Sequence, residues 1–303
     1  MTRDQLAAAI GPAADTVGSM VQLRSGDFLL SILGVAASRD LFRDADQVVR
    51  RSAEMRQVIE HPDEFPNDIA LDFDEHGVVD GYTAWSQSYD APGTNPAIIL
   101  DESLTDAVFA AAPRGRALDV ACGSGRQVAR LAALGYDVDG IDLTPAMLEL
   151  AQRRCPDATL RVGGWDQLPY EDGSFDLVTT ALALCHAPDL GPPIAEMARV
   201  LRPGGWLVVS DIHPTSTTFG GAAGYPGDRL GHFPFVRNHV HSLSEYFAAF
   251  TANGLTVRAL DEAFLDAEHA AMLPSHLAYP EGTARAFVGL PMIVAWTAVR
   301  PAV

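Results

Sequence analysis

The stretch Ala-Leu-Asp-Val-Ala-Cys-Gly-Ser-Gly-Arg, residues 117–126, decides the fold. It predicts an apolar strand that contains Asp119 near its end and then runs into a glycine-rich turn. Gly123 and Gly125 carry no side chain and adopt positive φ angles readily, so the backbone can lie against a ligand at the end of a parallel strand. A helix from Arg126 to Leu134 would then direct its N-terminal amides toward that ligand.

The same stretch argues against a dinucleotide, another common ligand of such a turn. The third glycine of a Gly-x-Gly-x-x-Gly pattern would fall at position 128, which holds Val128. Asp119 at the strand end would repel a pyrophosphate and attract an amine. An NAD-dependent oxidoreductase therefore remains an alternative hypothesis rather than the leading one.

A second strand is predicted by Tyr-Asp-Val-Asp-Gly-Ile-Asp, residues 136–142. A carboxylate at its end, Asp142, can accept hydrogen bonds from both hydroxyls of a ribose. Thr144 at a cap position and Pro145 in a first turn then predict a helix, which continues with apolar residues at helical spacing. The two strand ends together indicate a nucleoside site.

These motifs resemble those of the class I S-adenosylmethionine (SAM) methyltransferases, a family with a seven-stranded, Rossmann-like sheet. The acid-x-Thr-x-x-Met-Leu pattern of residues 142–148 is similar to the family, as are residues 163–178 and the Leu-Arg-Pro-Gly-Gly turn of residues 201–205. The resemblance covers about residues 80–303. It implies SAM as the cofactor.

The resemblance also implies roles for individual residues of the cofactor site. Asp119 would bind the ammonium group of SAM. The family usually places an acid for the adenine amino group where this chain has Gly164, so Asp166 or a backbone carbonyl would replace it and Trp165 would stack on the purine. The expected cofactor-binding residues are Tyr82, Trp85, Tyr89, Asp119, Gly123, Gly125, Asp142, Leu143, Trp165 and Asp166.

The string Tyr82-Thr-Ala-Trp85-Ser-Gln-Ser-Tyr89-Asp resembles the helix that precedes the core in many small-molecule methyltransferases. In those proteins it closes over the methionine end of the cofactor. An aromatic stripe that packs a helical lobe onto the core is the alternative. Both interpretations stay open.

The order of predicted elements gives an α/β fold, doubly wound around a mostly parallel seven-stranded sheet. By resemblance, residues 255–260 and 291–298 form its antiparallel pair. We expect two domains: residues 1–80, a helical N-terminal lobe with a connector rich in Pro, Asp and Gly, and residues 81–303, the methyltransferase domain.

Residues 213–241 predict an inserted lid or substrate segment after the fifth strand. An insertion of this length inside a compact domain is usually functional. Its glycines supply mobility, and its aromatic residues suggest a flat or apolar acceptor. Packing of these rings against the first 60 residues is the alternative.

Methyl transfer is an in-line displacement, so a base helps only when the acceptor must lose a proton. His213, at a strand end before Pro214, is the first candidate for that base. His186, after the fourth strand, is another catalytic candidate, and His241 is expected to contact the substrate. His239 and His241 without a nearby carboxylate or cysteine are weak evidence for a metal, so we expect none.

The composition of the chain favours some classes of binding partner over others. The formal net charge of −18, without a basic cluster, disfavours RNA or DNA and favours a small-molecule acceptor. Neither a signal peptide nor a membrane span is recognisable, which predicts a soluble, cytoplasmic protein without a membrane partner. The three cysteines are expected to be reduced and buried. The sequence leaves open whether the protein forms a homodimer.

The sequence therefore predicts a SAM-dependent methyltransferase that acts at O, N or C of a small, apolar or aromatic metabolite, with natural-product tailoring as the expected setting. The alternatives are the NAD-dependent oxidoreductase and a SAM-binding regulatory or scaffold subunit without turnover. Binding of NAD would indicate the former, and SAM binding without transfer the latter.

Overall fold

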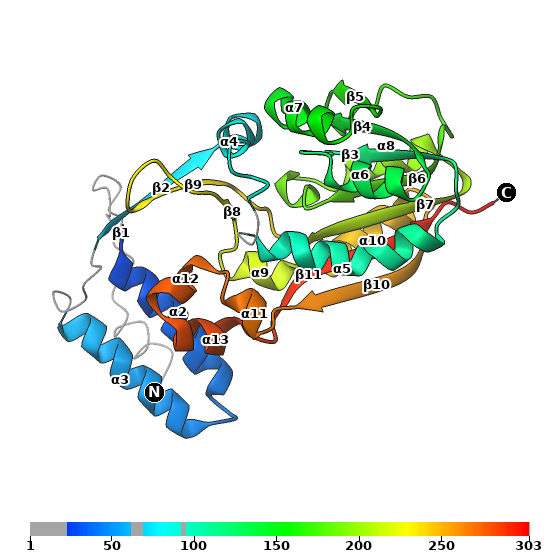
Figure 1. The fold of residues 1–303 in the computed structure, drawn as a ribbon. Helices are drawn as coiled ribbons and strands as arrows, with labels where there is room; N and C mark the ends of the chain where they lie inside the picture. Colours follow the sequence, from blue (N-terminus) through cyan, green and yellow to red (C-terminus); the bar gives the residue numbers. More distant parts are fainter. Residues whose placement is uncertain (1–22, 62–68, 92–94, 303) are drawn as a thin grey trace.

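One seven-stranded sheet with helices on both faces forms the centre of the fold. The computed structural model describes residues 23–61, 69–91 and 95–302. The strand order is β10-β11-β7-β6-β3-β4-β5 (Figure 1). The strands are β3 (Arg116–Val120), β4 (Asp137–Asp142), β5 (Thr159–Val162), β6 (Phe175–Ala181), β7 (Leu201–Ile212), β10 (Thr256–Phe264) and β11 (Pro291–Val299).

The pairing confirms the predicted doubly wound sheet. β11 runs antiparallel to both β7 and β10, whereas the pairs β3–β4, β3–β6, β4–β5 and β6–β7 are parallel. The carboxyl ends of β3, β4, β6 and β7 therefore meet at one edge of the sheet, where ligands bind in folds of this class.

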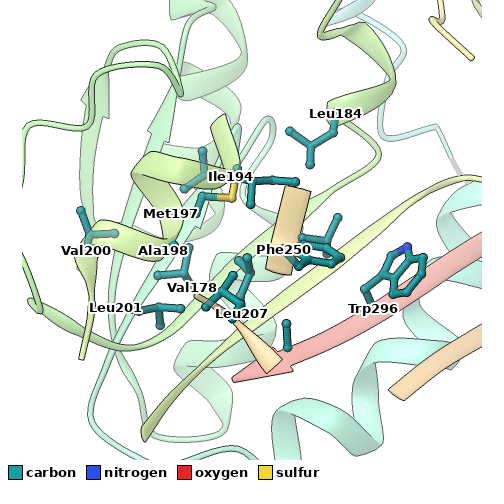
Figure 2. Close-up of a cluster of buried hydrophobic side chains, with 14 of the residues drawn as sticks. Val178, Leu184, Ile194, Met197, Ala198, Val200, Leu201, Leu207, Phe250 and Trp296 are labelled. Carbon is teal, nitrogen blue, oxygen red and sulfur yellow. The ribbon is translucent and has the colours of Figure 1, made fainter. Parts of the chain in front are cut away.

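Alternate side chains of the central strands bury against opposite helical layers. Leu118, Val178 and Leu207 pack in one buried cluster with residues of α8 (Gly191–Val200) and α10 (Leu243–Ala252), as Figure 2 shows for most of its members. The neighbouring residues Ala117 and Leu177 pack in a second cluster on the other face. There the covering helices are α5 (Pro96–Ala111), α6 (Arg126–Ala133) and α7 (Pro145–Arg154).

The helices begin where the sequence offers a cap. Ser242 and Glu245 form a reciprocal capping box at the start of α10. Pro145 stands in the first turn of α7, as predicted, but the Thr144 side chain makes no cap hydrogen bond. The Thr144 amide donates to the Asp142 carboxylate at 2.8 Å, which ties the start of α7 to the end of β4.

A second, smaller sheet pairs segments that were not predicted to lie together. Its order is β1-β2-β9-β8, and β2 runs parallel to β9. β2 lies within residues 61–80, the expected connector, and β9 lies within residues 213–241, the expected lid or substrate segment. The strands are β1 (Leu23–Arg24), β2 (Ala70–His76), β8 (Ala223–Gly224) and β9 (His232–Val236).

Helices from both ends of the chain form the lobe beside this second sheet (Figure 1). Arg51 of α3 is fully buried and donates to Tyr279 and Glu281 near the C-terminus, at 2.7 Å each. Residues 1–22 of the expected helical lobe lie outside the described residues. The helices are α2 (Ser25–Asp40), α3 (Ala45–Glu60), α11 (Ala267–Ala270), α12 (Pro274–Ala278) and α13 (Pro280–Phe287).

Two further helices connect the parts. α4 (Val78–Trp85) follows β2 directly, and α9 (Pro214–Thr218) follows β7. Because β2 pairs with a strand from beyond residue 213, the second sheet crosses the expected boundary at residue 80. The division of the chain into two domains at residue 80 therefore stays a proposal.

Candidate functional site

The glycine-rich turn between β3 and α6 has the left-handed backbone that its sequence suggests. Gly123 has φ of +53° and Gly125 of +79°. A Cβ on Gly125 would lie 3.0 Å from the Ala151 backbone of α7, whereas the nearest described atom to a Cβ on Gly123 is Met147 Cε at 3.5 Å. The absence of a side chain at Gly125 thus permits close packing of α7 against the turn. Gly123 has more open space beside it, where a ligand can approach the backbone.

Asp119 is the most unusual side chain at this edge of the sheet. It is 1% exposed, and neither carboxylate oxygen has a hydrogen-bond partner among the residues that the structure describes. Burial raises the pKa of Asp119 well above its ordinary value, and the nearby Arg126 guanidinium opposes that rise. An unsatisfied buried polar group costs about 1–3 kcal/mol, and a charged one more. Asp119 is therefore suited to a cationic donor supplied by a ligand.

Asp142 ends β4 next to the same turn. Its two oxygens accept hydrogen bonds from the backbone amides of Gly123 and Thr144, each at 2.8 Å. Burial raises the pKa of Asp142, and these two amides oppose the rise. The amides fix the orientation of the carboxylate, and each oxygen keeps acceptor capacity for a hydroxyl. This geometry suits the ribose role expected from the sequence.

The segment after β5 supplies the residues expected at the adenine. Asp166 Oδ1 lies 2.9 Å from the position that a Cβ on Gly164 would occupy. The carboxylate of Asp166 thus stands beside the place where the family usually has an acid. Trp165 is half-buried and packs against the core, while Leu143, after β4, is 48% exposed.

The aromatic residues of α4 and its following turn lie beside this edge. Tyr82 stacks on Trp85 with ring centroids 5.6 Å apart, and Tyr89 meets Trp85 edge-on at 5.0 Å. On its other side Trp85 stacks on Tyr225, at 5.5 Å and 18°. The stripe thus packs against residues 213–241 of the expected lid. Tyr82 also reaches His186, with 2.9 Å between its hydroxyl and Nε2.

The turn that carries Tyr89 is tied to the glycine-rich turn by polar contacts. Asp90 accepts a hydrogen bond from the Ser124 hydroxyl at 2.9 Å and pairs with Arg154 of α7 at 2.8 Å. Arg154 donates in turn to the Ser124 carbonyl at 2.6 Å. These contacts hold the aromatic segment over the end of β3.

The three candidate histidines occupy different environments. His213 caps α9, since its Nδ1 accepts from the Thr215 amide at 3.1 Å, and its Nε2 lies 2.8 Å from Glu262 of β10. Burial lowers the pKa of His213, and Glu262 opposes the shift. Nδ1 thus caps the helix, while Nε2 faces Glu262 without a hydrogen bond of good geometry, so the proton-transfer role of His213 stays a proposal.

His241 is likewise held inside the protein. Its Nε2 lies 2.7 Å from the Ala187 carbonyl, and its ring meets Tyr246 edge-on. The His239 ring is 6.3 Å away. Among the described residues, no group of three or more His, Cys, Asp or Glu side chains is placed to hold a metal ion. His186, which faces Tyr82, is the histidine next to the aromatic residues of α4.

A buried acid that the sequence interpretation missed stands at the end of β7. Asp211 is fully buried and accepts hydrogen bonds from the Tyr246 hydroxyl and the Ile212 amide, each at 2.8 Å. Burial raises its pKa, and the Tyr246 and Cys185 side chains oppose the rise. The position just before His213, at a strand end, was the available signal. All three cysteines are free and buried, as predicted.

One hollow of about 510 Å³ lies outside this edge, between α5 and α6. Its lining includes Tyr89, Glu102 and Arg126, but neither Asp119 nor Asp142. Acids and arginines of its lining pair with one another, as Arg126 does with Glu102 at 3.0 Å. The strand ends, with the unsatisfied acid, remain the candidate site.

Comparison with known proteins identifies the central region. Residues 118–209 match a family model described as a methyltransferase domain. This region is a methyltransferase domain. The matched segment contains the glycine-rich turn, Asp119, Asp142 and the residues after β5, so the motifs that suggested a class I methyltransferase are confirmed as family motifs. The match disfavours the dinucleotide hypothesis.

Curated relatives of the methyltransferase domain carry quinone names. The demethylmenaquinone methyltransferase of Renibacterium salmoninarum is 35% identical over 164 residues, which cover 52% of this chain and 64% of that protein. The ubiquinone/menaquinone biosynthesis C-methyltransferase UbiE of Citrifermentans bemidjiense is 36% identical over 115 residues, 35% of this chain and 49% of that protein. The chain thus spans about half to two thirds of these relatives.

Two solved structures share the fold. One is a putative methyltransferase in complex with the Haloferax volcanii Trm112 methyltransferase activator, with a TM-score of 0.50, 22% identity, and coverage of 73% of this chain and 97% of that one. The other is the [4+2]-cyclase SpnF, with a TM-score of 0.50, 20% identity and coverage of 67% and 82%. At these identities the likeness concerns the fold alone.

Proposed function

We propose that the protein is a SAM-dependent methyltransferase that transfers a methyl group to O, N or C of a small, apolar or aromatic metabolite. The unsatisfied, buried carboxylate of Asp119 beside the glycine-rich turn is the observation that supports this proposal most directly. It fits the ammonium group of SAM. Asp142, held by two backbone amides, fits the ribose hydroxyls.

When bound, SAM supplies a methyl group on a positively charged sulfur, ready for in-line displacement. The protein's own residues would then orient the cofactor and keep water away from the acceptor. Asp166, which folds beside Gly164, would accept from the adenine amino group, and Trp165 would line the purine. Tyr82, Trp85 and Tyr89 would cover the methionine end. His213 and His241 remain weaker candidates for acting on the acceptor.

The aromatic lining supports an aromatic or apolar acceptor. The rings of Tyr82, Trp85 and Tyr225 form a continuous stack beside the strand ends. Aromatic faces bind flat apolar molecules by area and by ring stacking. The quinone names of the relatives agree with this class of acceptor. Natural-product tailoring is the setting that we propose for it.

Calorimetric titration with SAM and S-adenosylhomocysteine tests the cofactor proposal, with NAD as the control ligand. Asp142→Ala should weaken SAM binding at least about 100-fold, since two hydrogen bonds to a charged acceptor are lost. Asp137→Ala is the matched control, because Asp137 lies on the same strand with a side chain 78% exposed. Binding of NAD, or equal SAM affinity in both variants, would refute the assignment.

A non-catalytic SAM-binding subunit is the second candidate, because this fold does not fix the chemistry. One solved structure of similar fold bears the name of a cyclase. Tight SAM binding without methyl transfer to any aromatic acceptor would favour that candidate. Turnover with one acceptor would exclude it.

We further propose a cytoplasmic protein whose partner is a small molecule rather than a nucleic acid, on the basis of its net charge of −18. No helix in the described part of the chain is long and apolar enough to cross a membrane. A homodimer is part of the proposal, and light scattering of the purified protein decides between one and two copies.

A further inference from the structure

His186 is the candidate histidine with a hydrogen-bond partner at each ring nitrogen. It lies in a short 3-10 turn, η2 (Leu184–His186), directly after β6, and is 8% exposed. Its Nδ1 is 2.9 Å from the Arg237 carbonyl. A carbonyl oxygen only accepts, so Nδ1 must carry the hydrogen and donate it. In the neutral ring, Nε2 is therefore the lone pair that can take a proton.

The partner of that lone pair is a phenol. The Tyr82 hydroxyl lies 2.9 Å from His186 Nε2 and donates to it. Burial, helped by the nearby acids and thiol, raises the pKa of Tyr82 well above its ordinary value, so the phenol keeps its proton. Asp142 is among those acids. The phenol of Tyr82 thus keeps its proton beside a basic nitrogen.

We propose that His186 Nε2 accepts the proton of a phenolic hydroxyl on the methyl acceptor, and that the Tyr82 phenol holds that hydroxyl's place until the acceptor binds. The inference rests on the proposed methyl transfer and narrows its acceptor to hydroxylated aromatic rings. Trp85 stacks on Tyr82, and Tyr225 stacks on the far side of Trp85. An incoming ring would meet an aromatic wall and the same nitrogen.

The reaction balances with groups already named. The acceptor oxygen forms a bond to the methyl carbon with its lone pair, and the electron pair of the broken S–C bond remains on sulfur. The phenolic proton moves to His186 Nε2. The positive charge leaves the sulfonium as a positive charge arises on the imidazole. General-base assistance of this kind contributes about 10²–10⁴-fold to a rate.

The electrostatic surroundings favour a neutral ring before the reaction. Burial lowers the pKa of His186, while the Arg237 carbonyl and Asp211 oppose that shift and His239 adds to it. The titratable groups that surround the ring are Tyr82, Cys185, Asp211 and His239. A base with a pKa below its ordinary 6.5 is ready to accept a proton at neutral pH.

The test compares two phenols of different acidity in full-length protein loaded with SAM. 1-Naphthol needs a base at pH 8, whereas 4-nitrophenol is largely ionised there without help. His186→Gln should lower the rate with 1-naphthol at least about tenfold, since only a small share of 1-naphthol ionises unaided at pH 8, and change the rate with 4-nitrophenol less than about threefold. Calorimetry should show unchanged SAM affinity in this variant, which separates failure of this inference from failure of the cofactor proposal.

Tyr82→Phe is the second variant, since it removes the hydroxyl and keeps the stacked ring. It should tighten 1-naphthol binding by about fivefold, the equilibrium factor of one hydrogen bond that no longer competes. An equal loss with both phenols in His186→Gln would assign His186 a structural role and overturn the inference. So would a Tyr82→Phe variant that binds 1-naphthol no more tightly than wild type, or a SAM-binding wild type that methylates neither phenol.

Discussion

Replacing Asp119 by Asn should stabilise the ligand-free protein while it weakens SAM binding. The carboxyl group is buried without a hydrogen-bond partner among the described residues, and burial raises its pKa well above 3.8. In the unfolded chain the same carboxyl ionises freely near its ordinary value. The folded state therefore binds more protons between these two values, and its stability falls as the pH rises through that interval. Because Asn does not ionise, the Asp119→Asn variant should not lose stability in this way as the pH rises.

The expected size follows from the burial. An unsatisfied buried polar group costs about 1–3 kcal/mol, and a charge costs more than the amide that replaces it. We therefore expect Asp119→Asn to raise the free energy of unfolding of the ligand-free protein by about 1–3 kcal/mol at pH 8, and the midpoint temperature by about 2–4 °C per kcal/mol. The gain should shrink at pH 4, where the carboxyl of the wild type is protonated.

Differential scanning fluorimetry at pH 4, 6 and 8, with and without SAM, measures both effects. Asp139→Asn is the control, because Asp139 is also buried, at 5% exposed, on the adjacent strand but pairs with Arg116 at 3.2 Å. That variant should lose stability rather than gain it. An Asp119→Asn protein that is less stable than wild type at pH 8, or that binds SAM as tightly, would refute the argument that this carboxylate awaits a cationic ligand.

Two further substitutions test the site's supports. Gly125→Ala should lower the free energy of unfolding by at least about 1 kcal/mol in chemical denaturation, because φ is +79° and a Cβ would lie 3.0 Å from the Ala151 backbone. Gly135→Ala is the control: Gly135 also has a positive φ, but no described atom lies within 4 Å of its Cβ position, so the loss should be smaller. Tyr246→Phe should cost about 1–3 kcal/mol by leaving an oxygen of buried Asp211 unpaired, a loss that shrinks once acid protonates that carboxyl. Equal costs for the two glycines, or a Tyr246→Phe loss that does not change with pH, would contradict these accounts.

The central sheet was predictable because its signals are local. Each parallel strand is a short apolar run that ends in a turn or an acid, and a helix pattern follows it within a few residues. The glycine-rich turn at residues 121–125 and the acid of Asp142 need only neighbours in the chain to be recognised. Their positions in the structure agree with those expectations.

The second sheet was not predictable in the same way. β2 contains Asp72, Asp74 and Glu75, residue types that are depleted in strands, so its composition suggested a connector. Its partner β9 begins about 160 residues later, and no local pattern announces such a pairing. The strand exists because tertiary pairing outweighs a weak local preference.

His213 shows how one local pattern can fit two uses. Its place at a strand end before Pro214 indicated a base, yet the same His-Pro-Thr order describes the start of a helix, and the ring caps α9. His186 carried a weaker signal in the sequence. The feature that distinguishes it, a phenol on Nε2, comes from a helix about 100 residues earlier.

The acceptor side of the site therefore depends on segments that are far apart in the chain. Tyr225 donates to or accepts from His76 at 2.5 Å, and His76 pairs with Asp74 of β2 at 2.9 Å, so the second sheet holds the ring that stacks on Trp85. None of these three contacts involves Asp119, Asp142 or the glycine-rich turn. Changes in the second sheet can reshape the aromatic wall while they leave the proposed cofactor contacts in place. We expect a separation of this kind to let one core serve different acceptors, with Tyr82, Trp85 and Tyr225 outside the matched residues 118–209 and His186 within them.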